Sequence, residues 1–178
     1  YLCMRVFLCR FASQHLTGFW PIILTEMVRI LAQAKVDLPA DKSDRLQLVF
    51  SVVKLADFLI TLQTDDFQIH QWLLITDTPD ATNPASSYMA DSLLDCLAKF
   101  VSECQRELVF DANDSLERAQ QRRPLLQMSS VATISTLQPF FATASRAFYQ
   151  CDFHATLDWD NINACLLHDL FEPIHTNT

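Results

Sequence analysis

The chain has 178 residues, half of them hydrophobic, and carries a net charge of −8. It contains a single glycine against a usual content of about 7%, which argues against an all-β fold because tight hairpins need glycine for positive φ angles. The negative charge argues against nucleic-acid binding, which usually requires a basic face, and the length is sufficient for one domain with a real core.

Eight helices are predicted from the spacing of apolar side chains at three to four residues. They span, in chain order, residues 2–12, 17–34, 44–63, 65–77, 86–108, 124–132, 136–151 and 159–171. Loops are expected at 35–43 and 78–87, and a polar connection at 111–123. The chain is therefore predicted to be all-α, with antiparallel helices stacked as a short HEAT-like α-solenoid or as a helical bundle.

The second helix begins with an unusual tryptophan–proline pair. Thr17 is one candidate N-cap, because a hydroxyl can accept a hydrogen bond from an amide of the first turn. A start at Pro21 is the alternative, because proline prefers the first turn, and Trp20 is then the cap residue. In either case Trp20 should point with Leu24, Met27 and Leu31 into the layer beneath. Ile23 and Val28 are expected on the same face.

The third helix has only a narrow polar stripe. Its polar side chains recur at helical spacing: Gln47, Ser51, Lys54, Asp57 and Thr61. Nearly every other residue of the helix is apolar, so we expect it to be covered on more than one side, as in an interior layer of stacked helices.

The later helices also have expected faces. Residues 86–108 should bury one apolar side made by Met89, Leu93, Leu97, Phe100, Cys104 and Leu108. Residues 136–151 should bury Leu137, Phe141, Ala144 and Phe148. The last helix has Asp158 or Asp160 available as its N-cap.

No motif for catalysis or for a cofactor is found. Glycine-rich phosphate loops and the GxSxG motif need more glycine than the single Gly18. Cys165 and His168 are three residues apart but lack the second ligand pair that zinc requires. We therefore expect no enzyme activity, no metal and no cofactor. The six cysteines lack paired spacing, which is typical of buried reduced thiols in a cytosolic protein.

Aromatic and basic side chains are the candidates for partner binding. They are Phe67, Gln68, Trp72, Arg122 and Arg123. Residues 1–178 are predicted to form one helical domain, with a weaker boundary near 78–87. The chain starts within an apolar helical pattern without a methionine, so we expect a fragment of a longer chain. The uncharged stretch 124–145 holds too many polar residues to span a membrane.

Several segments resemble, in order, the C-terminal region of the Dopey family of large cytosolic proteins. SQHLTGFWPIILTEMVRIL (13–31) has the hydroxyl, Trp–Pro–Ile and Glu–Met pattern of that family. VVKLADFLITL (52–62) and DFQIHQWLLI (66–75) resemble its next two elements, and STLQPFFATASRAF (135–148) its Leu–Pro–Phe–Phe helix. NINACLLHDLFEPI (161–174) aligns more loosely with its terminal helix. The signature residues are Thr17, Trp20, Pro21, Pro139 and Phe140.

The resemblance implies a non-enzymatic scaffold or assembly domain. Dopey proteins are peripheral membrane proteins that act in endosome-to-Golgi traffic, on the cytosolic face of Golgi and endosome membranes. The implied partners are a Mon-family scaffold related to Arf exchange factors and a type 4 P-type lipid flippase complex, and self-association as a homodimer is a further expectation. Membrane association is expected to be indirect. The alternative is a module that binds a membrane surface or lipid head groups.

Overall fold

The computed structural model describes residues 2–11, 13–37, 39, 43–62, 64–70, 74, 93–104, 137, 140, 141, 144 and 157–171. All regular structure in this part of the chain is helical, which confirms the predicted all-α class. The α-helices are α1 (Leu2–Arg10), α2 (Trp20–Val36), α3 (Asp44–Leu62), α4 (Asp65–His70), α6 (Leu93–Cys104) and α9 (Trp159–Phe171). The predicted helix 124–132 and the loop 78–87 lie outside the described residues.

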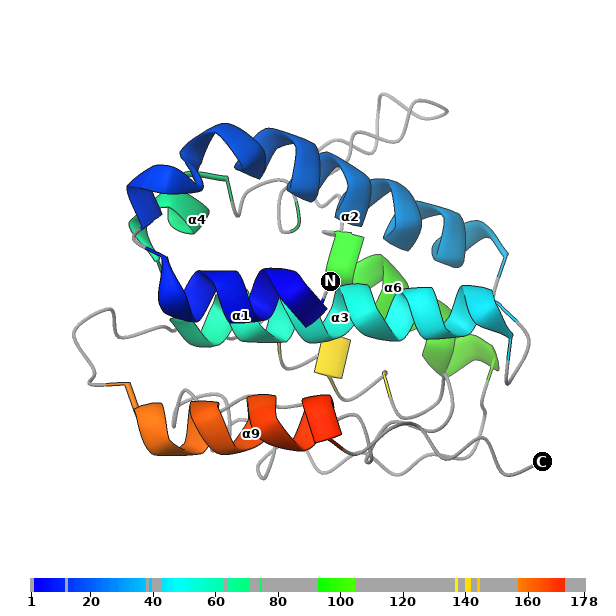
Figure 1. Cartoon of the computed structure of the whole chain (residues 1–178). Helices are drawn as coiled ribbons and strands as arrows, with labels where there is room; N and C mark the ends of the chain where they lie inside the picture. Colours follow the sequence, from blue (N-terminus) through cyan, green and yellow to red (C-terminus); the bar gives the residue numbers. More distant parts are fainter. Residues whose placement is uncertain are drawn as a thin grey trace.

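The helices form a stack of tiers (Figure 1). α2 makes the top tier, α1 and α3 lie together in the middle, and α9 lies below them. α1, α2 and α3 reverse direction in turn, and α2 also packs against α4 and α6. Buried hydrophobic side chains from every tier belong to one continuous cluster, so each helix is held by a shared core.

α2 begins after two short 3₁₀ turns, Ser13–His15 and Thr17–Phe19. The N-cap residue is Phe19, without a side-chain hydrogen bond. The prediction that Thr17 caps this helix is therefore wrong, because Thr17 lies inside the preceding turn and its hydroxyl donates to the carbonyl of Gln14 at 3.4 Å. Trp20 is not the cap residue either, since it is already helical, and Pro21 lies in the first turn, where its missing N–H costs least.

The buried face of α2 agrees with the predicted one only in part: Trp20, Leu24, Met27 and Leu31 are buried, but Ile23 and Val28 are half-buried. It consists of Trp20, Leu24, Met27, Ile30, Leu31 and Ala34. At its other end the N–H of Asp37 donates to the carbonyl of Gln33 at 3.1 Å, and Arg45 binds both that carbonyl and the Asp37 carboxylate. These contacts fix the angle between the end of α2 and the start of α3.

α3 is the interior helix that its composition predicts. Ser43 caps it, because its Oγ accepts a hydrogen bond from the N–H of Leu46 at 3.1 Å. Every residue from position 52 to 62 is buried, so the second half of the polar stripe is covered as well, while Gln47 and Ser51 in its first half are half-buried. Lys54 and Asp57 are each only 1% exposed, and the hydroxyl of Thr61 donates to the carbonyl of Asp57.

α6 confirms one predicted face only in part. Leu93 and Leu97 are buried, but Phe100 is half-buried, while Leu94 and Val101 are buried in its place. Three residues that the predicted helix 136–151 should bury, Leu137, Phe141 and Ala144, are helical and buried as expected, and Phe140 is helical and buried as well. Met89, Leu108, Phe148 and Pro139 lie outside the described residues.

α9 has the predicted bounds, and Asp158 is its N-cap. The Asp158 carboxylate accepts a hydrogen bond from the N–H of Asn161 at 3.0 Å. We expect Asp158→Ala to lower the free energy of unfolding by about 1 kcal/mol, measured by urea denaturation. Asp160→Ala is the control, since Asp160 is in the first turn but makes no capping bond to a described amide. An equal loss in both variants would show that only charge near the helix end matters.

Candidate functional site

The outward face of α1 carries an exposed pair of aromatic rings. Phe7 and Phe11 are 44% and 53% exposed, and their rings meet edge to face with centroids 5.4 Å apart. The N–H of Phe11 donates to the carbonyl of Phe7 at 2.9 Å, which holds Phe11 one turn beyond its partner. Arg10 is exposed on the same side of α1, because it is three residues from Phe7. The opposite side, with Leu8 and Arg5, is buried.

α9 presents a second row of exposed side chains. Trp159 and Leu167 are 48% and 53% exposed, and Asn163 between them is exposed as well. These positions are four residues apart and therefore share one face of the helix. Ile162 and Leu166 pack into the core, so the cap at Asp158 and this packing together set the outward direction of that row.

A hollow of about 140 Å³ lies between α1 and α9. Val6, Cys9 and Arg10 line it from α1, and Asn163, Leu166 and Leu167 line it from α9. The two helices pack against each other and run in opposite directions (Figure 1). Arg10 is the one charged residue among the described residues that line the hollow. We call the hollow together with Phe7, Phe11 and Trp159 the α1–α9 surface.

Burial and a nearby charge shift the pKa of the Cys9 thiol, which lines this hollow, in opposite directions. Burial raises the pKa of Cys9, and the nearby Arg10 guanidinium lowers it by a smaller amount, so the net shift is upward. The thiol is therefore protonated at neutral pH and is a weak nucleophile. The hollow is consequently suited to binding an apolar group, and Cys9 is not an activated nucleophile there.

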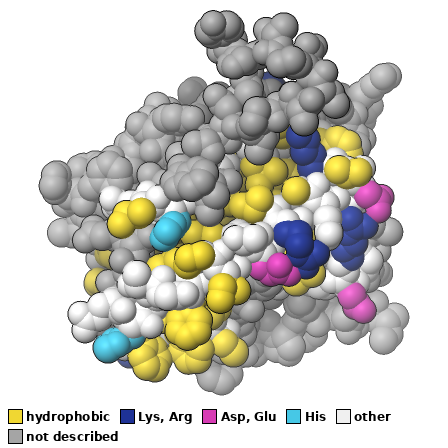
Figure 2. Space-filling view, turned by 90° about the horizontal axis from the view of Figure 1, so that it is seen from above, with side chains coloured by type: hydrophobic (Ala, Val, Ile, Leu, Met, Phe, Trp, Pro, Cys, Tyr) yellow, Lys and Arg dark blue, Asp and Glu magenta, His cyan; other side chains and the backbone are white. Residues whose placement is uncertain are grey.

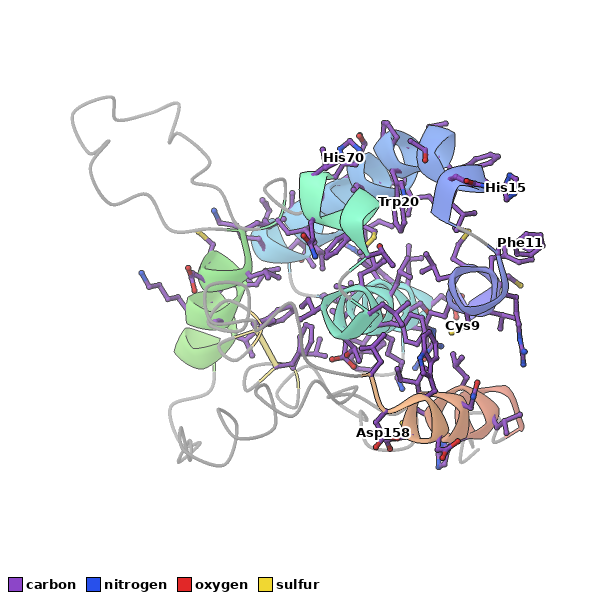
Figure 3. The ribbon with its side chains drawn as sticks, turned by 90° about the vertical axis from the view of Figure 1, so that its left-hand side faces the viewer. Cys9, Phe11, His15, Trp20, His70 and Asp158 are labelled. Carbon is purple, nitrogen blue, oxygen red and sulfur yellow. The ribbon has the colours of Figure 1, made fainter. Side chains whose placement is uncertain are left out.

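Further apolar side chains continue this exposed region toward the start of α2. Phe19 and Ile22 are 58% and 69% exposed. Phe11 and His15 project from the same edge of the molecule, where α1 meets the turns before α2 (Figure 3). Figure 2 shows hydrophobic side chains gathered at the lower left of the molecule, beside a histidine.

The structure places two of the predicted partner-binding residues on α4. Phe67 is fully buried, and its ring packs against Trp20 with centroids 6.3 Å apart. Its ring is thus part of the core in this fold and is not exposed to a partner. Gln68 is half-buried, and a binding role for it stays a prediction. Trp72, Arg122 and Arg123 lie outside the described residues.

Cys3, Cys9, Cys96 and Cys165 are free thiols. The prediction of buried thiols is confirmed for Cys165, but Cys9 and Cys96 are half-buried and Cys3 is exposed. Cys3 differs because it lies on the outward face of α1.

No group of three metal-ligating side chains occurs within the described ranges. No helix in those ranges combines the length and apolar character needed to cross a bilayer.

The sequence analysis missed the α1–α9 surface. The available signal was the segment LCMRVFLCRF at 2–11, whose apolar residues surround the whole helix. A single layer of neighbours covers one side of such a helix, so some of these residues must remain exposed or bind something else. The pairing of α1 with α9 carries no local signal, because more than 140 residues separate the two helices in the sequence.

The fold and the surface together define an all-α domain with one exposed apolar edge. The profile of a protein family described as DOP1 C-terminal matches residues 1–154. The chain is 24% identical over 180 residues to protein DOP1B of Xenopus laevis and 28% identical over 182 residues to protein DOP1B of Mus musculus. It is also 29% identical over 154 residues to protein pad-1 of Caenorhabditis briggsae. No solved structure matches the chain.

The chain belongs to the DOP1 C-terminal family, which confirms the Dopey resemblance. The two DOP1B comparisons each cover 83% of the chain, and the pad-1 comparison covers 80%. The chain spans only 8% of the length of each DOP1B protein and 6% of that of pad-1.

Proposed function

We propose that this domain is a non-enzymatic assembly module of a Dopey protein, and that it binds protein partners through the α1–α9 surface. The observation that carries the proposal is the exposure of four large apolar side chains on two packed helices, Phe7 and Phe11 on α1 and Trp159 and Leu167 on α9, with Leu167 lining the hollow between them. Aromatic residues are enriched where proteins bind one another, and a contiguous exposed apolar surface marks an interaction site.

The proposal places the domain in endosome-to-Golgi traffic, at the cytosolic face of Golgi and endosome membranes. The partners proposed are the Mon-family scaffold, the type 4 P-type flippase complex or a second copy of the chain. Membership of the Dopey family supports this placement. The absence of a motif for catalysis in the sequence supports the non-enzymatic role.

Direct binding to lipid is the competing function. Exposed Phe7 and Phe11 beside Arg10 resemble the composition of interfacial helices, which combine aromatic and basic residues. The net charge of −8 opposes binding to anionic membranes, and a hollow between helices accepts a side chain better than it accepts a bilayer. We therefore favour a protein partner.

The test replaces both exposed rings in the full-length protein, as Phe7→Glu with Phe11→Glu. We expect co-purification with the Mon-family scaffold to fall at least about tenfold, because two charges would enter a desolvated contact. Thr25→Glu, at an exposed position of α2, is the matched control and should leave co-purification unchanged. Thermal melting of each variant checks that the fold is kept.

Unchanged co-purification in the double variant would contradict partner binding through this surface. Flotation of the 178-residue chain with vesicles that contain 20% phosphatidylserine tests the competing function. Robust flotation that the double variant loses would replace the protein partner with a lipid surface.

A further inference from the structure

The hollow between α1 and α9 has a volume that fits one apolar side chain. Its volume is about 140 Å³, close to the roughly 150 Å³ of an apolar cavity that holds benzene. A leucine, methionine or phenylalanine side chain is of this class. Val6, Cys9 and Leu166 supply apolar walls for such a group, and Leu166 is also part of the core, which makes that wall rigid.

The arrangement of α1 and α9 favours a helix as the part of the partner that carries this side chain. α1 and α9 lie side by side (Figures 1 and 3), and the hollow lined by both helices forms a groove between them. Exposed Phe7 flanks the groove on α1, and exposed Leu167 flanks it on α9. A helix laid in such a groove presents apolar side chains three, four and seven residues apart, which matches one inserted residue with flanking contacts on either side.

Charge selects the polar part of the ligand. The side chain of Arg10 is exposed and forms no hydrogen bond or ion pair with another described residue, and among the described residues that line the hollow it is the one charged group. A guanidinium binds a carboxylate through two parallel hydrogen bonds. Of the other arginines in residues 1–36, Arg5 is buried and Arg29 pairs with Glu26, so Arg10 is the exposed cation that α1 offers to a ligand.

We propose that the α1–α9 hollow is the docking site for an amphipathic helix of a partner protein. The helix inserts one bulky apolar side chain between Cys9 and Leu166, and it places a glutamate or aspartate, one turn away, against Arg10. This inference rests on the proposed function, because it specifies the element of a protein partner that the α1–α9 surface binds.

The first experiment selects 16-residue helical peptides from a phage-displayed library against the 178-residue chain. The selected peptides should share a Leu, Met or Phe three or four positions from a Glu or Asp. Leu167→Glu and Arg10→Glu should each weaken their binding at least about tenfold in fluorescence anisotropy. Thr25→Glu should change it less than about twofold. Leu167→Gln and Arg10→Gln are the milder variants to use if a melting curve shows loss of the fold.

The second experiment uses the two thiols of α1. Cys9 lines the hollow, whereas Cys3 is exposed outside it. A bound peptide should slow alkylation of Cys9 by N-ethylmaleimide at least about fivefold, measured by mass spectrometry, and should change Cys3 less than about twofold. Cys3 thereby controls for effects of the peptide on the reagent or on the whole chain.

Three outcomes overturn the proposal: no selected binder, binders that Leu167→Glu does not affect, or unchanged labelling of Cys9. The predicted acidic residue is contradicted if the selected peptides still bind the Arg10→Glu variant, or if they share basic residues instead of Glu or Asp. These results are independent of the Mon-family scaffold. Loss of scaffold co-purification together with a failed selection would leave the proposed function intact and remove only the helix in the hollow.

Discussion

Trp20→Ala should lower the free energy of unfolding by about 3–5 kcal/mol, the usual cost of removing a large aromatic side chain from a core. Trp20 is 1% exposed and packs on the fully buried Phe67, so the substitution leaves a cavity between α2 and α4. For a chain of this size each kcal/mol lowers the melting temperature by about 2–4 °C. Differential scanning calorimetry measures the shift.

The adjacent aromatic residue gives the matched control. Phe19 precedes Trp20 in the chain but is 58% exposed, so Phe19→Ala should change the unfolding free energy by less than about 0.5 kcal/mol. Equal melting temperatures for the two variants would show that the Trp20 ring is not a core group. Trp20→Phe should cost less than Trp20→Ala, because it keeps a ring against Phe67 and removes an indole N–H that finds no acceptor among the described residues.

The core of the fold was predictable from the sequence where apolar spacing is strong. α3 and α9 have nearly the bounds that periodicity predicts, and four of the six residues expected on the inner face of α2 are buried. These helices are long relative to one turn, so several residues define each face. The single glycine pointed in the same direction by removing the turns that a β-sheet needs.

Local details were less predictable because tertiary contacts decide them. The sequence allowed α2 to begin with a Thr17 cap, but the chain forms 3₁₀ turns there, and Thr17 bonds backward to Gln14. On α6, burial moves from Phe100 to Val101, a rotation of the buried face that packing against α2 sets. A segment that is apolar on several sides is predicted to be a helix, but the pattern does not determine which side of that helix is buried.

The candidate site depends on contacts that no short pattern encodes. Phe67 was a candidate for partner binding because it is aromatic, yet it lies beneath Trp20. Phe7 and Phe11 are equally apolar and remain exposed, since the distant α9 covers only one flank of α1. Spacing within a helix cannot separate these two cases, which differ only in which helices are neighbours.

The polar stripe of α3 shows the same limit with charged residues. A stripe of Lys, Asp and Thr on an apolar helix usually marks the side that faces water. Here Lys54, Asp57 and Thr61 are all buried, and so is Arg5 of α1, which packs against α3. Asp57 is the one buried acidic side chain among the described residues. Two basic side chains are buried as well: Lys54, three positions earlier on the same face of α3, and Arg5.

Asp57→Ala should therefore lower the free energy of unfolding by about 3–5 kcal/mol, the range seen when one member of a buried ionic group is removed. The loss arises because two cations stay in the core with one less negative charge to offset their desolvation. Asp44→Ala is the control, since Asp44 is exposed in the first turn of the same helix and should cost at most about 1 kcal/mol. Urea denaturation at pH 7 measures both.

Asp57→Asn separates charge from hydrogen bonding, because an amide of the same shape keeps an acceptor oxygen but loses the negative charge. If charge balance holds this layer together, Asp57→Asn should lose nearly as much stability as Asp57→Ala. A loss close to that of Asp44→Ala would instead assign the stripe to hydrogen bonding alone. The explanation by buried charges would fail outright if Asp57→Ala unfolded at the same urea concentration as the unaltered chain.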